Sequence, residues 1–406
     1  MVLQPLLGIA ALLGIGWLLS TNRRAVRWRP VFVGLALQWV LALLILRTPL
    51  GPAFFDTAQS LFKNLIELAK QGAKEVVGSA GLGLDGNPPL LGLLIFVTVV
   101  FFSSLFSILH HLGVVRVVVG AMARVMSRLM GTSGAESTSA AANIFVGQTE
   151  APLLVRPYLK TMTRSEIGAI MTVGFATVAG GVFALYVGML QDKDPEIAGH
   201  LLAATVMSAP IGLGFAKLVF PETDEPETLG RDISQPKSEY ANLVDAAATG
   251  AGEGMKLALN IVAMLVAFLA LLAVINALLG WIHEGTSLEG ILGGLLAPLA
   301  WLLGVPAEES RAVGSLLGVK VAVNEYIAYG TLMSEDLDGL SDRSRRIASY
   351  ALCGFANFSS IAIQIGGLGA MAPERRPEIT RLGLRAMTAG ACASFLTAAT
   401  AAMFMA

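Results

Sequence analysis

Two glutamates, Glu150 and Glu325, lie inside long apolar stretches of the chain, where a charge is expensive. An ionisable side chain at the centre of a membrane helix costs about 2.5–3.5 kcal/mol on insertion scales. A purely structural role would be served more cheaply by an apolar residue. We therefore interpret both glutamates as candidate binding residues, with a buried structural hydrogen bond as the alternative for each.

Amide and hydroxyl side chains accompany the two glutamates, and such groups both donate and accept hydrogen bonds. No Arg or Lys lies among them in the sequence to pair with a carboxylate or a phosphate. This composition favours a neutral polar solute, to which Phe355 could offer a flat face unless it only packs in the core. The candidate substrate-binding residues from this pattern are Gln148, Thr149, Glu150, Glu325, Phe355, Asn357 and Ser360.

A second pattern is that of a cation site. A half-helix is expected to end at 143–147, and the carbonyls at a helix C-terminus are unpaired and negative. Glycines at 174, 180 and 181 permit local unwinding nearby, although close helix packing is their alternative role. If the two breaks meet, a hard cation such as Na⁺ could be held by the carbonyls of Val146 and Val178 and the side-chain oxygens of Asn143 and Thr177.

The composition places these residues in a membrane protein. The chain has 406 residues, 55% of them hydrophobic and only 14% charged, whereas a soluble domain has about 25% charged residues. We therefore predict an all-α polytopic membrane protein. The net charge of −1 gives no basic surface for nucleic acid. Cys353 and Cys392 both lie in apolar runs, where they are expected to act as small buried hydrophobic residues.

Eight transmembrane helices are predicted from the apolar runs. Arginines crowd the loop 21–29, so the positive-inside rule makes this loop cytoplasmic and the N-terminus external. No positive charge precedes the first run, which argues against a cleaved signal peptide. The balanced segment 47–87 is expected outside and the polar connector 221–254 inside. The predicted spans are 2–20, 30–45, 89–110, 166–190, 200–220, 255–281, 346–365 and 383–405.

Two further segments are too short to cross a membrane. The stretch NIFVGQTEAPLLVRPY at 143–158 has two apolar arms of at most about ten residues, and a crossing takes about twenty. We predict a re-entrant hairpin over 134–160 with a polar tip, since Gly147 ends one arm and Pro152 suits the start of the next. A second hairpin is predicted over 310–333, and interfacial helices over 113–130 and 287–305.

The two hairpins belong to an internal repeat. Each hairpin is followed by a helix with a similar break, Gly-Phe-Ala-Thr at 174–177 and Gly-Phe-Ala-Asn at 354–357. The predicted topology orients the two hairpins oppositely, as in the inverted repeats of secondary transporters, whose site lies near the membrane midplane. The expected division is 1–110 mainly scaffold spans, 111–220 first transport repeat, 221–285 polar connector and scaffold span, and 286–406 second transport repeat.

Three motifs carry a resemblance to a known family. They are GQTEAPLLVRPY at 147–158, VNEYIAYGTL at 323–332 and GFANFSSIAIQIGGLG at 354–369. Together they resemble the concentrative nucleoside transporters, specifically the sodium-coupled bacterial members, and the likeness covers nearly the whole chain. The resemblance implies a homotrimer in which a scaffold domain holds the assembly and a transport domain moves across the membrane like an elevator.

The resemblance also implies residue roles. Gln148, Thr149 and Glu150 would contact the nucleobase, with Val182 lining that side, whereas Glu325, Asn357 and Ser360 would hold the ribose hydroxyls and Phe355 would lie against the ligand. Sodium would be bound at Asn143, Val146, Thr177 and Val178. Thr177 stands where a close relative is expected to carry Ser, and the hydroxyl is retained.

The expected function is uptake of nucleosides such as uridine, driven by an inward Na⁺ gradient across the bacterial inner membrane, with no cofactor besides that ion. Some bacterial relatives use protons, so a proton-coupled carrier with Glu150 or Glu325 as the relay is the main alternative. An intramembrane enzyme has less support, because the sequence lacks HExxH and other catalytic constellations among the spans. A passive channel is a third alternative.

Overall fold

A computed structural model describes residues 3–82, 90–191, 194–233, 240–334, 337 and 339–405, and these parts are almost entirely helical, with no strand among them. The short 3-10 turns are η1 (Arg23–Ala25), η2 (Ala80–Leu82) and η5 (Pro373–Arg375). The remaining elements are α1 (Leu3–Leu18), α2 (Trp28–Arg47), α3 (Leu50–Val77), α4 (Leu91–His111), α5 (Val114–Met130), α6 (Gly134–Ala142), η3 (Ala151–Tyr158), α7 (Arg164–Ala176), α8 (Gly180–Leu190), α9 (Ile197–Val219), α10 (Leu243–Ile282), α11 (Leu288–Leu302), α12 (Ser310–Ala322), α13 (Glu325–Leu332), α14 (Asp342–Leu352), α15 (Phe358–Met371) and α16 (Arg376–Phe404).

The predicted class, an all-α polytopic membrane protein, is confirmed. Among the described residues six stretches are long and apolar enough to cross a membrane: α2, α4, α7 with α8, α9, α10 and α16. The other two predicted spans correspond to α1, which has only 16 residues, and to the broken pair α14 and α15. The predicted interfacial helices correspond to α5 and α11.

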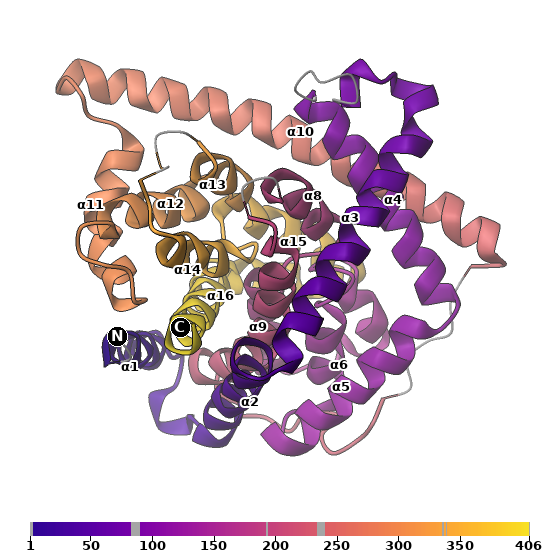
Figure 1. Ribbon diagram of the computed structural model, residues 1–406. Coiled ribbons are helices and arrows are strands. Elements are labelled where there is room, and N and C mark those ends of the chain that lie inside the picture. Colours follow the sequence, from indigo (N-terminus) through magenta and orange to yellow (C-terminus); the bar gives the residue numbers. More distant parts are fainter. Residues whose placement is uncertain are drawn as a thin grey trace.

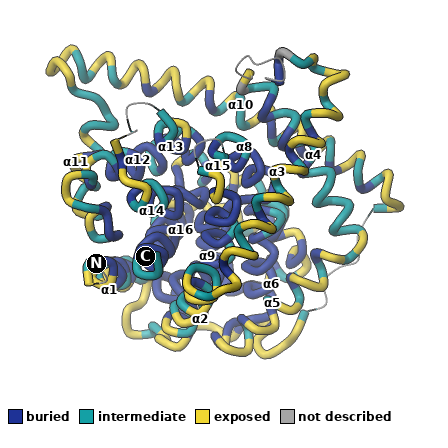
Figure 2. The backbone as a smooth tube through the Cα atoms, in the orientation of Figure 1, coloured by how far each residue is buried: buried dark blue, intermediate teal, exposed yellow. Residues whose placement is uncertain are grey.

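The helices form an enclosed interior and an apolar periphery. Helices α7, α8, α9, α14 and α16 lie in the middle of the molecule, while α10 runs along one edge and crosses α4 (Figures 1 and 2). In the most apolar window of α10 only 11% of residues are buried, against 89% in α9. Since the exposed residues of α10 are largely Leu, Val and Ile, this outer helix is suited to lipid or to another subunit.

One long helix was not predicted. The segment 47–87 was expected outside and no helix was assigned to it, but its first part forms α3, a 28-residue helix that packs against α9, α4 and α2. Buried Ala58, Ile66 and Ala69 mark its inner face, and its exposed surface carries lysines and glutamates together with exposed leucines such as Leu61 and Leu68. Because charged residues are spread along the whole segment, the helical spacing of its buried residues was not recognised in the sequence. The end of the segment, 83–89, lies outside the described residues.

Both predicted hairpins have arms too short to cross a membrane. In the first, α6 has 9 residues and η3 has 8; in the second, α12 has 13 and α13 has 8. Even the longest arm spans about 20 Å, and a bilayer core is about 30 Å thick. Gly147 turns the first tip with φ 100°, a conformation that favours glycine. Pro152 starts the second arm as predicted, although that arm is a 3-10 helix and contains Pro157.

The two predicted breaks are present and touch each other. Helix α7 ends at Ala176 and α8 begins at Gly180, while α14 ends at Leu352 and α15 begins at Phe358. Gly354 has φ 133°, and a Cβ added there would lie 2.9 Å from the carbonyl oxygen of Phe175. Glycine is therefore required where the two repeats meet. A hairpin followed by a broken helix occurs in both halves, and this arrangement gathers the loop segments at one place.

Candidate functional site

A cavity of about 280 Å³ lies between the hairpin tips, the helix breaks and α10. Mostly apolar walls with a few convergent polar groups are typical of small-molecule sites. Every residue predicted to bind substrate lines this cavity: Gln148, Thr149, Glu150, Val182, Glu325, Phe355, Asn357 and Ser360. The structure therefore brings together residues separated by about two hundred positions, 148 to 360, in the sequence.

Glu325 is held in place by two hydrogen bonds. The hydroxyl of Tyr186 donates to Oε1 at 2.7 Å, and Nδ2 of Asn357 donates to Oε2 at 2.8 Å. A carboxylate has about four acceptor positions, so Glu325 keeps capacity for further donors on the cavity side. Such an oriented carboxylate suits a ligand with adjacent hydroxyl groups, because hydrogen bonds to charged groups are the stronger ones.

The asparagines of the second repeat also organise the backbone. Asn357 Oδ1 accepts from the Ser360 backbone N–H at 2.8 Å and so caps α15. Asn324 caps α13 in the same way, through the backbone N–H of Ile327 at 2.9 Å. Each cap satisfies an otherwise unpaired N–H at a helix start. The polar side chains facing the cavity are therefore fixed by the same residues that begin these helices.

Gln148 is held by a residue that sequence reasoning missed. Gln364, in α15, donates from Nε2 to the Gln148 side-chain oxygen at 3.0 Å and to the Met171 carbonyl at 3.0 Å. The available signal was one glutamine in the apolar run of 358–371. Tyr186, which was also missed, carried no such signal, because a tyrosine in an apolar helix is usual in a core.

Helix α10 supplies a wall that was not predicted. Glu253, Leu257, Asn260 and Met264 line the cavity at helical spacing. The signal was present in the sequence, since Glu253 and Asn260 are polar residues seven positions apart and hence on one face of a helix. This wall comes from the helix at the edge of the molecule, so the cavity lies between the enclosed interior and the periphery.

The four residues predicted to bind sodium lie beside the cavity rather than in its lining. Asn143 follows the end of α6 and Thr177 follows the end of α7, and Nδ2 of Asn143 donates to Oγ1 of Thr177 at 2.6 Å. Two helix C-termini therefore meet, and both direct negative partial charge to one place.

Oxygen atoms remain available at this meeting point. The Asn143 Oδ1 atom is buried and has no hydrogen-bond partner among the described residues. Within the same parts of the chain, no backbone N–H donates to the carbonyl oxygens of Val146 and Val178. A buried side-chain oxygen without a donor in the described residues, close to two helix C-termini and to carbonyls that accept no backbone N–H, fits a hard cation such as Na⁺, which prefers oxygen ligands.

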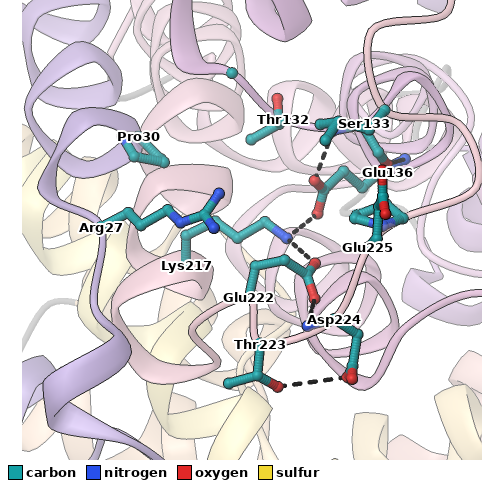
Figure 3. A pocket seen from close by; sticks show the side chains of 13 residues that line it. Arg27, Pro30, Thr132, Ser133, Glu136, Lys217, Glu222, Thr223, Asp224 and Glu225 are labelled. Atoms are coloured by element: carbon teal, nitrogen blue, oxygen red, sulfur yellow. Dashed lines mark hydrogen bonds and ion pairs between the residues drawn. The ribbon is translucent and has the colours of Figure 1, made fainter.

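A second buried polar cluster lies elsewhere, around Lys217 near the end of α9 (Figure 3). Lys217 Nζ lies 2.7 Å from Glu136 Oε2 and 3.1 Å from Glu222 Oε2, and it donates to Ser165 Oγ at 2.8 Å. The cavity beside this cluster has a volume of about 430 Å³ and includes Asp224 of the acidic loop after α9.

Comparisons with known proteins identify the family of the chain. Three family models match the chain: "Na+ dependent nucleoside transporter N-terminus" at residues 7–80, "Nucleoside recognition" at 93–193, and "Na+ dependent nucleoside transporter C-terminus" at 200–402. Nucleoside permease NupC of Helicobacter pylori is 38% identical, with 99% of this chain and 98% of that protein covered. Sodium/nucleoside cotransporter 1 of Mus musculus is 39% identical, with 97% of this chain and 62% of that protein covered.

Solved structures of CNTnw have the same fold. An inward-facing, substrate-bound state matches with a TM-score of 0.90 and 41% identity, covering 100% of this chain and 98% of that chain. A variant in an outward-facing state matches with a TM-score of 0.90 and 40% identity, covering 99% of this chain and 97% of that chain. The fold and the site thus define a membrane transporter and not an enzyme. The chain belongs to the concentrative nucleoside transporter family.

Proposed function

We propose that this protein imports nucleosides such as uridine by symport with Na⁺. The proposal rests on the position of Glu325. Tyr186 and Asn357 orient its carboxylate, which lines the cavity and can still accept further hydrogen bonds there. A ribose presents neighbouring hydroxyl donors that match this carboxylate. Gln148, Thr149 and Glu150 face the same cavity and would meet the nucleobase, with Val182 beside it.

Sodium would act through the helix ends at Asn143 and Thr177. Val146 and Val178 would add carbonyl oxygens to the same ion. Because Gln148 lies only a few residues after this site, the ion would brace the tip of the first hairpin against the α7–α8 break. A filled cation site would therefore complete the nucleobase end of the cavity, and ion and nucleoside would bind with positive coupling.

The driving force is sufficient for accumulation. Moving one elementary charge through 100 mV supplies about 2.3 kcal/mol. That energy corresponds to an accumulation of about fiftyfold before any Na⁺ concentration gradient is counted.

For the larger assembly we propose a homotrimer in the bacterial inner membrane, with elevator-type movement of the interior body. Support comes from the separation of an enclosed interior from an exposed apolar helix, α10, that also lines the cavity. CNTnw has been solved in inward-facing and outward-facing states with the same fold. If the interior helices moved past α10, different residues of α10 would line the cavity.

Calorimetric titration of uridine into the purified protein tests the proposed coupling. We expect uridine to bind at least about tenfold more tightly in Na⁺ than in choline at the same ionic strength. Affinity that ignores Na⁺ and follows pH would favour the proton-coupled alternative, with Glu150 or Glu325 as the titrating group.

A further inference from the structure

Gln364 is a buried amide whose direction is set by the backbone. Its side chain is 1% exposed, and its Nε2 atom lies 3.0 Å from the carbonyl oxygen of Met171. A backbone carbonyl only accepts hydrogen bonds. The Gln364 atom at this position must therefore be the nitrogen, whichever way the amide was first assigned.

The direction of Gln148 follows from that of Gln364. The same Nε2 atom of Gln364 also lies 3.0 Å from the side-chain amide of Gln148. Since this nitrogen only donates, the Gln148 atom facing it must be the oxygen. The amide nitrogen of Gln148 is then left on the other side, and Gln148 lines the substrate cavity.

Two features accompany this pair of glutamines within the described parts of the chain: a glycine beside them and an unpaired oxygen on Gln364. A Cβ at Gly174 would lie 2.5 Å from Gln364 Nε2 and 3.1 Å from Gln148 Cβ, so only glycine fits between them. The Gln364 oxygen is buried and has no hydrogen-bond partner among the described residues. An unsatisfied buried oxygen destabilises the fold, and an apolar side chain in α15 would avoid this loss.

We propose that Gln364 is a specificity-determining residue that, with Met171, locks the Gln148 amide so that it offers a donor to the nucleobase. The inference rests on the proposed nucleoside binding. A donor at this position requires an acceptor on the base, such as the exocyclic carbonyl of uracil or hypoxanthine. Cytosine and adenine carry an exocyclic amino group, which donates, at the corresponding edge.

Competition calorimetry with uridine, cytidine, inosine and adenosine tests this role on the full-length protein. We expect the wild type to bind uridine at least about tenfold more tightly than cytidine, and inosine more tightly than adenosine by a similar ratio. In Gln364→Leu the Gln148 amide is free to rotate, so both ratios should fall to within about threefold.

Gln38→Leu is the matched control. Gln38 is also a fully buried glutamine with hydrogen bonds through both amide atoms, to Thr397 and Thr400, and it does not line the cavity. This variant should lose stability and keep the wild-type ratios. If the affinity ratios in Gln364→Leu equal those of the wild type, the inference is overturned but the proposed function stands. If the wild type binds none of the four nucleosides, the proposed function is overturned as well.

Gln148→Glu provides an independent test if Gln364→Leu does not fold. One carboxylate oxygen would accept from Gln364, and the other would offer an acceptor to the base. Cytidine should then bind more tightly than uridine. A retained preference for uridine would show that the polarity of position 148 does not set the choice of base, and this result would overturn the inference.

Discussion

The two buried polar regions of this protein differ in how completely their groups are satisfied. Lys217 donates hydrogen bonds to Glu222 and Ser165, and its ammonium group forms an ion pair with Glu136 at 2.7 Å. Glu325 receives two donors, and its remaining acceptor capacity faces a cavity. The cavity beside Lys217 is the larger one, at about 430 Å³ against about 280 Å³. The proposed binding site is therefore distinguished by the unused acceptor capacity of Glu325 toward its cavity, and not by the volume of that cavity.

The Lys217 cluster is best understood as a structural connection. It joins α6 of the first hairpin, α7, α9 and the acidic loop that follows α9 (Figure 3). Ser133 and Thr163 begin α6 and α7 with capping boxes, and Ser133 Oγ donates to Glu166 at 2.5 Å. From the sequence, the acidic loop was expected only to be a polar connector, but Glu222 of this loop contacts Lys217 of α9 and Thr163 at the start of α7.

The largest expected effect is on stability, from Lys217→Met. Removing one partner of a buried ionic cluster costs about 3–5 kcal/mol, because the remaining charges are left buried and unpaired. Chemical denaturation should show this loss, while calorimetry on the folded protein should show uridine affinity within about twofold of wild type. Adding Glu136→Gln should restore part of the stability. If a stable Lys217→Met protein bound uridine much more weakly, the cluster would belong to the binding site. The distinction between a structural Lys217 cluster and a substrate-binding Glu325 cavity would then be wrong.

The next effect is on binding, from Glu325→Gln. The substitution removes the carboxylate that would accept the ribose hydroxyls, and a hydrogen bond to a charged group is worth about 1.5–3 kcal/mol. Uridine affinity should therefore fall by about tenfold to more than a hundredfold. Calorimetry measures this loss, and a melting temperature close to that of the wild type serves as the control. Unchanged uridine affinity would refute the assignment of Glu325.

Tyr186→Phe should produce a smaller loss through the same carboxylate. The variant removes one donor to Glu325 and leaves the Asn357 donor in place. We expect uridine affinity to fall by about fivefold, in line with a loss of about 1 kcal/mol for one hydrogen bond. Combined with Glu325→Gln, the second substitution should add little, because both act through one group. Fully additive losses would show that Tyr186 acts separately.

Thr177→Val tests the cation site and should have the smallest effect on the cavity itself. The substitution removes the hydroxyl that accepts from Asn143 and keeps the side chain's shape. More Na⁺ should be needed for half-maximal uridine binding, with little change in affinity once Na⁺ is saturating. An unaltered Na⁺ dependence would show that the ion binds elsewhere.

The sequence predicted those features that depend on local pattern. Hairpin tips, the two broken helices and the glutamates were visible because polar residues and glycines interrupt apolar runs, as at Glu150 and Gly354. It did not reveal contacts made across long separations. Tyr186 reaches Glu325 over 139 positions and Gln364 reaches Gln148 over 216. Local pattern cannot report such pairs, since they arise only when the two repeats pack together.

The most direct test of the account is uptake of radiolabelled uridine into proteoliposomes, with and without an inward Na⁺ gradient. We expect accumulation against the uridine gradient that requires Na⁺ and increases when the interior of the vesicles is made negative. Uptake that ignores Na⁺ and follows a proton gradient would contradict the proposed ion coupling. Equilibration without accumulation would contradict active transport altogether.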